Sequence, residues 1–256
     1  MLFFSPPSEG LGEAIMITIV GAGPGDPELL TVKALKRIQE ADCILHDALV
    51  SDEILNLSRP DAQRIYVGKL YQDGQDQTDR QEWINQLIIE LAEKGQKVVR
   101  LKSGDPMIFG RGAEEIRFCI ENNLDYEVIP GVTSALGAAS LYGIPLTERG
   151  KNSMVLFGTG NYREGDFCDL ESFVSVLNSG SPIIFYMGLS KLVKLAQRLI
   201  ENSLSPEIKV QILSKVSQPD ACTFEGTLGN IEQLMASEKP PMPALVIIGR
   251  NAERLR

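Results

Sequence analysis

The sequence predicts a mixed α/β protein built from two domains. Short apolar runs typical of buried strands alternate with longer segments in which apolar residues recur three and four positions apart. With 256 residues, of which 43% are hydrophobic, the chain is long enough to bury a sizeable core. A polar stretch near the middle divides the strands into two series of similar length.

Nine apolar runs are expected to form strands. Five lie in the first half, at 16–20, 43–45, 64–67, 98–101 and 126–129, and four follow at 154–157, 183–186, 210–213 and 245–248. Helical spacing is clearest over 30–38 and 84–91. The segment 239–243 holds three prolines, which indicates a turn before the last strand.

The domain boundary is expected between 130 and 153. This gives an N-terminal α/β domain over 16–130 and a C-terminal α/β domain over 131–256. Residues 1–15 lack a basic segment and a long apolar stretch, so we interpret them as a loose extension rather than a signal peptide. No run approaches the roughly 20 apolar residues of a membrane helix, so no membrane partner is expected.

Composition disfavours several classes of function. The net charge is -9, and no basic stripe opposes it, which argues against a nucleic-acid partner. The four cysteines are too far apart for a Cys-x-x-Cys pair and are expected to be reduced thiols of a cytoplasmic protein. His46 is the only histidine, so no metal site is expected. It precedes Asp47, but neighbouring side chains of a strand point to opposite faces, so the two need not meet.

Three glycine-containing loops follow predicted strands, at 21–27, 104–106 and 130–134. The first is a poor dinucleotide-binding loop, because Pro24 has no N–H and Asp26 brings a negative charge where glycine is needed. It suits a turn into a helix, with Asp26 as N-cap and Pro27 at the first helical position. Ligands of open α/β sheets bind at the carboxyl ends of strands, so three such loops favour one shared pocket.

Five segments together resemble the tetrapyrrole methylase family. They are GAGPGDPELL (21–30), VRLKSGDPMIFGRGAEE (99–115), IPGVTSA (129–135), GIPLTER (143–149) and YMGL (186–189). They occur in order and at the family's spacing, and the resemblance runs from about 16 to about 250. It is strongest to the members that methylate uroporphyrinogen III.

This resemblance implies a two-domain α/β fold with the active site in a cleft between the domains, usually as a homodimer. It also implies S-adenosylmethionine as the methyl donor. The implied reaction is two successive C-methylations, at C2 and C7, that convert uroporphyrinogen III into precorrin-2. That product begins the siroheme and corrinoid (cobalamin) branch of tetrapyrrole biosynthesis.

Carried over position by position, the resemblance implies a set of residues around S-adenosylmethionine: Pro24, Ser103, Gly104, Asp105, Ile108, Thr133, Ser134, Met187 and Val216. Each has a structural alternative. Met187 and Ile108 could be core residues, while Thr133 and Ser134 could cap the following helix. A dry pocket of backbone carbonyls and apolar groups suits a sulfonium that loses its charge during transfer.

The resemblance also assigns catalytic roles to Asp47, Lys69 and Arg111. A carboxylate near a pyrrole N–H can accept or stabilise a proton as the attacking ring becomes cationic, and an ammonium can donate one. The alternatives are that Asp47 caps the helix near Asp52 and that Lys69 is a solvated loop charge.

Arg111, Glu114 and Arg149 are the candidates for binding the acidic substrate. Arg111 places a permanent cation in a loop expected to be flexible, and a guanidinium can grip a carboxylate bidentately. Arg149 is a natural second anchor. Glu114 and Glu115 could orient these arginines or lie on an exposed helix face near its N-terminus.

Three positions depart from the family pattern. Ser103 and Val216 stand in place of glycines, and Glu148 in place of a histidine. A positive φ would strain Ser103, and Glu148 would repel an acidic substrate unless Arg149 or Lys151 neutralises it.

These departures leave two alternatives open: a methylase of a later corrin precursor, and a non-catalytic relative that binds tetrapyrrole or S-adenosylmethionine. A nicotinamide-dependent dehydrogenase is disfavoured by the chemistry of Pro24 and Asp26.

Overall fold

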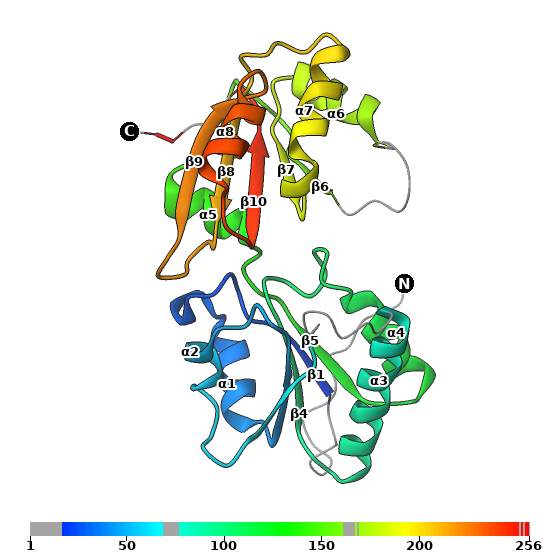
Figure 1. Cartoon of the computed structure of the whole chain (residues 1–256). Helices are drawn as coiled ribbons and strands as arrows, with labels where there is room; N and C mark the ends of the chain where they lie inside the picture. The colour runs from blue at the N-terminus through cyan, green and yellow to red at the C-terminus, as the bar shows by residue number, and fades with distance from the viewer. Residues whose placement is uncertain are drawn as a thin grey trace. The chain divides into compact units, whose positions relative to one another are not determined.

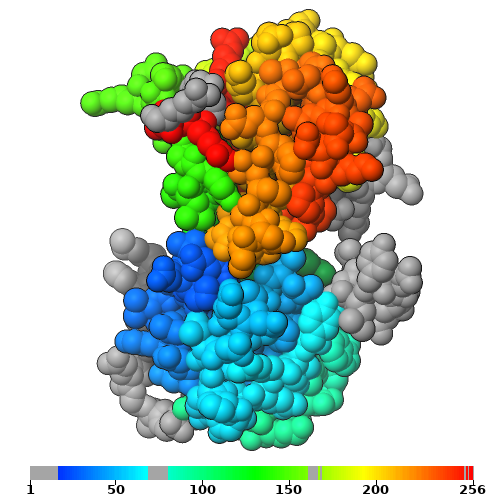
Figure 2. All heavy atoms as spheres, turned by 60° about the vertical axis from the view of Figure 1, so that its left-hand side comes forward, coloured from blue at the N-terminus to red at the C-terminus, as the bar shows by residue number. Residues whose placement is uncertain are grey.

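The computed structural model describes residues 17–68, 77–160, 167, 169–250, 252 and 254–255. It contains two compact units: unit 1 comprises Met1–Ala22 and Pro27–Gly131, and unit 2 comprises Gly23–Asp26 and Val132–Arg256. Figure 2 shows one face of the two units with all heavy atoms drawn. The segment interpreted as a loose extension, 1–15, lies outside the described residues.

Unit 1 is a five-stranded parallel sheet with helices on both faces (Figure 1). In spatial order its strands are β3 (Gln63–Tyr66), β2 (Cys43–His46), β4 (Val98–Lys102), β1 (Ile17–Gly21) and β5 (Tyr126–Ile129). The helical segments are η1 (Pro27–Leu29), α1 (Val32–Glu40), α2 (Asp52–Leu55), α3 (Gln77–Glu93) and α4 (Gly112–Glu121). All five strands expected in this half are confirmed, with ends shifted by at most one residue.

Alternate residues of the unit 1 strands supply two separate cores. Ile44 and Val99 pack with α1 and α2, whereas their neighbours Cys43 and Val98 pack with α3 and α4. Successive side chains of a strand point to opposite faces, so residues two apart share a face. The charged side chains of β4, at positions 100 and 102, therefore lie on the same face as Val98, towards α3 and α4.

Unit 2 is a mixed five-stranded sheet. In spatial order its strands are β6 (Leu156–Thr159), β7 (Ile183–Tyr186), β10 (Ala244–Ile248), β8 (Lys209–Ser214) and β9 (Cys222–Thr227). Only β6 and β7 pair in parallel, and the other pairs are antiparallel. The helical segments are α5 (Ser134–Tyr142), α6 (Leu170–Asn178), η2 (Leu189–Lys191), α7 (Leu192–Glu201) and α8 (Ile231–Glu238).

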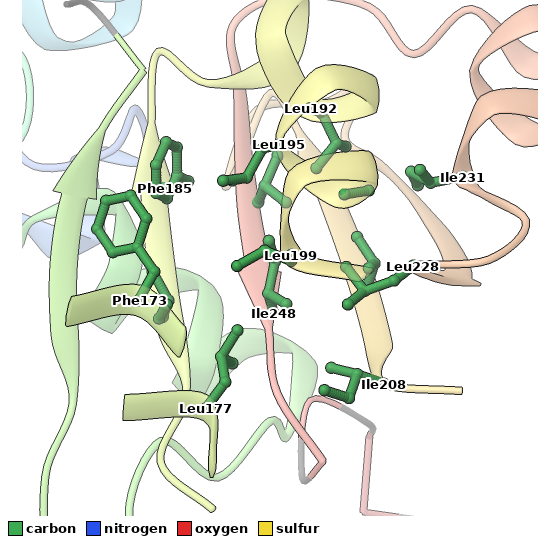
Figure 3. Close-up of a cluster of buried hydrophobic side chains, with 14 of the residues drawn as sticks. Phe173, Leu177, Phe185, Leu192, Leu195, Leu199, Ile208, Leu228, Ile231 and Ile248 are labelled. Carbon is green, nitrogen blue, oxygen red and sulfur yellow. The ribbon is translucent and has the colours of Figure 1, made fainter. Parts of the chain in front are cut away.

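The larger core of unit 2 lies between its sheet and α6, α7 and α8. Figure 3 shows Leu195 and Leu199 of α7 directed towards the strands that carry Phe185 and Ile248. Phe173 of α6 meets Phe185 edge to face, with ring centroids 5.2 Å apart. On the other face α5 packs through small residues such as Ala135 and Ala138, which let the helix approach the sheet closely.

Local structure differs from the sequence-based expectation at two places. The sequence did not predict the edge strand β9, because Glu225 and Gly226 interrupt its apolar residues and it pairs with β8 alone. Pro27 is the first residue of a helix, as expected, but this helix is the short 3₁₀ segment η1, and Asp26 as its N-cap stays a prediction. The following helix α1 is capped by Thr31, whose Oγ1 accepts the N–H of Ala34 at 3.1 Å.

The three glycine loops begin within unit 1, where Gly21, Gly104 and Gly131 meet at the carboxyl ends of β1, β4 and β5. A Cβ on Gly131 would lie 2.2 Å from the carbonyl oxygen of Gly104 and 2.8 Å from Cα of Gly21, so a side chain cannot fit. The carboxylate of Asp105 accepts the N–H of Gly131 at 3.0 Å and that of Met107 at 2.8 Å. The expected proximity of these loops is confirmed, while their sharing of one ligand pocket stays a prediction.

We expect Gly131→Ala to lower the free energy of unfolding by at least about 2 kcal/mol, because backbone atoms must move to admit the methyl group. Gly95→Ala is the control. Gly95 has a φ of 73° but open space around it, so alanine there adds only conformational strain of about 1 kcal/mol. Urea and thermal unfolding of both variants measure the difference. Equal losses would contradict the steric argument.

Candidate active site

Unit 1 contains a pocket of about 350 Å³ next to the carboxyl ends of β2 and β4. Its walls combine apolar side chains with several charged ones, a mixture that suits a large ligand with ionic substituents. The lining residues are Asp47, Ala48, Leu49, Val67, Gly68, Arg80, Gln81, Ile84, Arg100, Lys102, Ser103, Phe109, Gly110, Arg111 and Glu115.

Four of these residues form a network of ion pairs, three of them deeply buried. Glu115 Oε1 accepts hydrogen bonds from Arg100 Nε at 3.1 Å and from Lys102 Nζ at 2.8 Å. Arg100 Nη2 in turn donates to Asp47 Oδ2 at 3.2 Å. The side chains of Arg100, Lys102 and Glu115 are at most 5% exposed, and that of Asp47 is 33% exposed.

The network is electrically balanced, with two cations and two carboxylates. Burial opposes the charge of Arg100, but the carboxylates of Asp47 and Glu115 outweigh it and raise the pKa of the guanidinium. Burial, aided by the charge of Arg100, lowers the pKa of Lys102, while Glu115 opposes that change. Removing one member of such a buried set leaves the others without a partner and typically lowers the free energy of unfolding by about 3–5 kcal/mol.

Strand geometry explains why these side chains meet. Cys43, Leu45 and Asp47 share a face at the end of β2, and Val98, Arg100 and Lys102 share a face of β4; both sets of buried apolar residues pack towards α3 and α4. Glu115, in the first turn of α4, lies over that face.

Sequence reasoning missed Arg100 and Lys102. The available signal was two cations two positions apart in an otherwise apolar strand. The expectation that Glu115 either orients Arg111 or Arg149 or lies exposed was wrong, because it is buried against Arg100 and Lys102.

Asp47 is held by Arg100 rather than by a helix. The proposed alternative, that it caps α2, is wrong, because the N-cap of α2 is Ser51. Asp47 Oδ1 is buried and has no hydrogen-bond partner among the described residues. His46 contacts the backbone carbonyl oxygen of Asp47 at 3.4 Å and the ring of Tyr66, so it is no partner of the carboxylate. Lys69, the other candidate for proton transfer, lies outside the described residues.

Arg111 and Glu114 form a close ion pair at the start of α4. Arg111 Nε lies 3.0 and 3.1 Å from the two carboxylate oxygens, and Nη2 lies 2.6 Å from Oε2. Their hydrogen bonds raise the pKa of Arg111 and lower that of Glu114. Both side chains are nearly half exposed, so the pair stabilises the fold only weakly and remains accessible to a ligand.

The loop around Arg111 is closely packed against Pro106, and its expected flexibility stays a prediction. Gly110 and Gly112 are there because the chain passes close to Pro106: a Cβ on either would lie within 2.7 Å of the Pro106 carbonyl oxygen. Arg111 itself has a φ of 59°, a left-handed conformation that is uncommon for a residue with a side chain. Such conformations cluster at ligand sites, where the surrounding structure enforces them.

The remaining unit 1 candidates for the cofactor lie in the loop after β4. Gly104 adopts a left-handed φ of 69°, whereas Ser103 does not, so serine is unstrained where the family has glycine. Ser103 lines the pocket. Ile108 is half-buried, and both carboxylate oxygens of Asp105 are engaged by backbone N–H groups.

Unit 2 holds a second set of candidates around Tyr186. The hydroxyl of Tyr186 lies 2.7 Å from Thr133 Oγ1 and accepts the N–H of Ala135 at 3.3 Å. Thr133 occupies the N-cap position of α5, but its side chain makes no capping hydrogen bond. Met187 is 46% exposed with a φ of 51°, so the alternative of a core methionine is wrong. The half-buried Ser134 follows Thr133 as the first residue of α5.

The segment Gly23–Asp26 packs within unit 2. The ring of Pro24 lies against Gly137 of α5, with Cγ 3.1 Å from where a Cβ would stand. Asp26 donates its backbone N–H to Ser217 Oγ at 3.0 Å. Val216, which replaces a family glycine, is buried between two residues in left-handed conformations, at positions 215 and 217. Pro24, Val216 and the α5 start therefore belong to one packed region.

The negative charge of Glu148 is neutralised by Lys151, three residues further along the chain. Lys151 Nζ lies 2.8 Å from Glu148 Oε2, on the surface of unit 2. Arg149 is exposed and is therefore accessible to an anionic ligand. Among the described residues there is no cluster of three or more potential metal ligands, and none of their helices is long and apolar enough to cross a membrane.

Comparisons with known sequences agree with this geometry. Residues 16–232 match the family model described as tetrapyrrole (corrin/porphyrin) methylases. The chain is 46% identical over 233 residues to a siroheme synthase of Psychrobacter cryohalolentis, which covers 91% of this chain and 44% of that protein. A siroheme synthase of Neisseria meningitidis is 43% identical, with 91% and 47% covered. The chain thus spans about half the length of the curated relatives it matches.

Solved structures share the fold over almost their full length. A uroporphyrin-III C-methyltransferase from Thermus thermophilus, complexed with S-adenosylhomocysteine, is 35% identical with a TM-score of 0.76, covering 91% of this chain and 96% of that one. A cobalt precorrin-4 methyltransferase is 25% identical with a TM-score of 0.82, covering 96% and 99%. With a family model that matches most of its length, the chain belongs to the tetrapyrrole (corrin/porphyrin) methylases.

Proposed function

We propose that this chain is an S-adenosylmethionine-dependent C-methyltransferase that methylates uroporphyrinogen III twice, at C2 and C7, to give precorrin-2. The observation that carries the proposal is the pocket of unit 1, in which Asp47 is fixed by a buried cation and the accessible Arg111 lies at the rim. A polycarboxylate pyrrole macrocycle needs both kinds of group. Family membership and 35% identity to a uroporphyrin-III C-methyltransferase support the same substrate.

The residues proposed to hold S-adenosylmethionine are Pro24, Ser103, Gly104, Asp105, Ile108, Thr133, Ser134, Met187 and Val216. When bound, the sulfonium supplies an electrophilic methyl group. The chain fits such a ligand, because Gly104 has a left-handed φ and no side chain, and Met187 is exposed in a left-handed conformation. The Asp105 carboxylate is engaged by two N–H groups, which leaves backbone and apolar groups to receive the cation.

We propose that Asp47, Lys69 and Arg111 do the catalytic work and that Arg111, Glu114 and Arg149 bind substrate carboxylates. Asp47 can accept a hydrogen bond from a pyrrole N–H or stabilise the ring as it becomes cationic, because its side chain lines the pocket and is 33% exposed. Arg111 can exchange Glu114 for a substrate carboxylate with little loss, since an exposed ion pair contributes little. Positioning then supplies much of the acceleration.

A second candidate is methylation of a later corrin precursor. It is favoured by the TM-score of 0.82 to a cobalt precorrin-4 methyltransferase, although only 25% of residues are identical there. The backbone is common to both activities, so substrate choice depends on pocket side chains, and the higher identity supports uroporphyrinogen III.

We further propose a cytoplasmic homodimer serving siroheme or corrinoid synthesis. Cys43 and Cys119 are buried free thiols, and burial raises the pKa of each to about 11, which suits inert cysteines in a reducing compartment. The dimer is supported by family resemblance, and light scattering coupled to gel filtration tests it.

Incubation with S-adenosylmethionine and freshly prepared uroporphyrinogen III should add two methyl groups to the substrate, as measured by product mass. Calorimetric titration should detect binding of S-adenosylhomocysteine but not of NAD. Bound S-adenosylhomocysteine with no methylated product would favour the later-precursor activity or a binding role, and tight NAD binding would overturn the family-based assignment of the cofactor.

Arg111→Ala should reduce turnover of uroporphyrinogen III by more than about 10²-fold, because a bidentate anchor for a substrate carboxylate is lost. Affinity for S-adenosylhomocysteine should stay within about twofold. Arg117→Ala is the control, since Arg117 is exposed on the same helix outside the pocket lining. Unchanged turnover in Arg111→Ala would remove this residue from the substrate site.

Tyr186→Phe should weaken S-adenosylhomocysteine binding about fivefold. The variant loses the hydroxyl that contacts Thr133 and Ala135 at the start of α5, and the loss of these hydrogen bonds costs about 1 kcal/mol. Tyr142→Phe is the matched control in the same unit. Its ring lies 5.3 Å from the Arg254 guanidinium carbon, a contact that phenylalanine keeps. Calorimetry measures both; equal affinities for the wild type and Tyr186→Phe would separate this hydroxyl from the cofactor site.

A further inference from the structure

We propose that Glu115 is a positioning residue that keeps Asp47 bound to Arg100 by removing Lys102 as a competing partner. This inference rests on the proposed role of Asp47 in methyl transfer. It assigns a task to Glu115, whose buried carboxylate is hydrogen-bonded to Arg100 and Lys102 rather than to the exposed substrate anchor Arg111.

The first argument is the sharing of one oxygen. Glu115 Oε1 receives both Arg100 Nε, at 3.1 Å, and Lys102 Nζ, at 2.8 Å. Its other oxygen, Oε2, has no hydrogen-bond partner among the described residues. Glu115 therefore sits between two cations that are themselves two positions apart on one face of β4, and it holds them at a common point.

The second argument is the orientation of Arg100. With Nε fixed by Glu115, its Nη1 donates to the backbone carbonyls of Leu45 at 3.3 Å and Leu101 at 3.1 Å. Only Nη2 then reaches Asp47, at 3.2 Å. Because the guanidinium is planar and its other donors are held, Nη2 can point in only one direction. The position of Asp47 Oδ2 therefore depends on that of Glu115.

The third argument is charge. Without Glu115 the buried network would hold two cations, Arg100 and Lys102, and one carboxylate, Asp47. The ammonium of Lys102 is a mobile point charge on a flexible stem, and it already feels the negative charge of Asp47, which raises its pKa against the effect of burial. Lys102 would then turn to Asp47, because a buried charge without a partner is strongly unfavourable. The carboxylate would be drawn away from the position that Arg100 gives it.

The test compares Glu115→Gln with the double variant Glu115→Gln/Lys102→Gln, which restores neutrality by removing the competing cation. In Glu115→Gln we expect kcat for uroporphyrinogen III methylation to fall about 10²-fold, with KM and S-adenosylhomocysteine affinity little changed. In the double variant kcat should recover to within about fivefold of the wild type. Glu121→Gln, the same change at an exposed site of α4, is the control.

Crystal structures of both variants give a readout that does not depend on turnover. In Glu115→Gln, Lys102 Nζ should lie within hydrogen-bond distance of Asp47, and in the double variant the contact of Arg100 with Asp47 should be restored. If Glu115→Gln does not fold, the charge-balanced double variant alone tests the idea through its kcat and its Asp47 contact.

Loss of kcat in Glu115→Gln without recovery in the double variant would overturn the inference, as would an unmoved Asp47 in the Glu115→Gln crystal. Failure of the wild-type protein to methylate uroporphyrinogen III would instead count against the proposed function, and the crystallographic comparison would still decide whether Glu115 controls the partner of Asp47.

Discussion

The structure of unit 1 depends on the close approach of three glycines, Gly21, Gly104 and Gly131. Gly21 ends β1, while Gly104 and Gly131 follow β4 and β5, and the backbones approach so closely that neither Gly21 nor Gly131 has room for a Cβ. This contact holds together the loops at the carboxyl edge of the parallel sheet, the edge at which α/β proteins bind ligands. Asp105 reinforces the contact with two hydrogen bonds to backbone N–H groups. Residues in these loops are therefore placed by main-chain packing, which tolerates substitutions such as Ser103.

Charge in this protein is organised locally, against an overall excess of negative charge. A chain of net charge -9 is a poor attractor for an acidic ligand at long range. The buried cations Arg100 and Lys102 are balanced by carboxylates and cannot provide that attraction. Two exposed cations of the candidate site remain available to an acidic ligand: Arg111, which pairs with Glu114 on the surface, and Arg149. Recognition of a polyanion must then rest on short-range contacts, which ionic strength screens less than long-range steering.

The sequence predicted nine of the described strands and the meeting of the glycine loops, because these follow from periodicity and from backbone chemistry. It could not predict β9, whose residues are only half-buried at a sheet edge and carry little pattern. The partners of the charged residues could not be predicted from the sequence either. Whether Glu115 faces solvent or the sheet depends on the rotation of α4, and the rotation is set by its packing against the strands. The left-handed conformations of Met187 and Arg111 likewise have no signal in the sequence, because neither residue type favours a positive φ.

The path of the chain has a consequence for modular exchange. The backbone passes between the units three times, after Ala22, after Asp26 and after Gly131. The first segment of the chain in unit 2 is only four residues long, yet it contributes Pro24 to the packing on α5. A chimaera joined at 131/132 would carry a foreign second unit with a native Gly23–Asp26 insert, and a fragment starting at Pro27 would lack β1, which pairs with both β4 and β5. Recombination within this fold must therefore exchange two separated pieces of sequence at once.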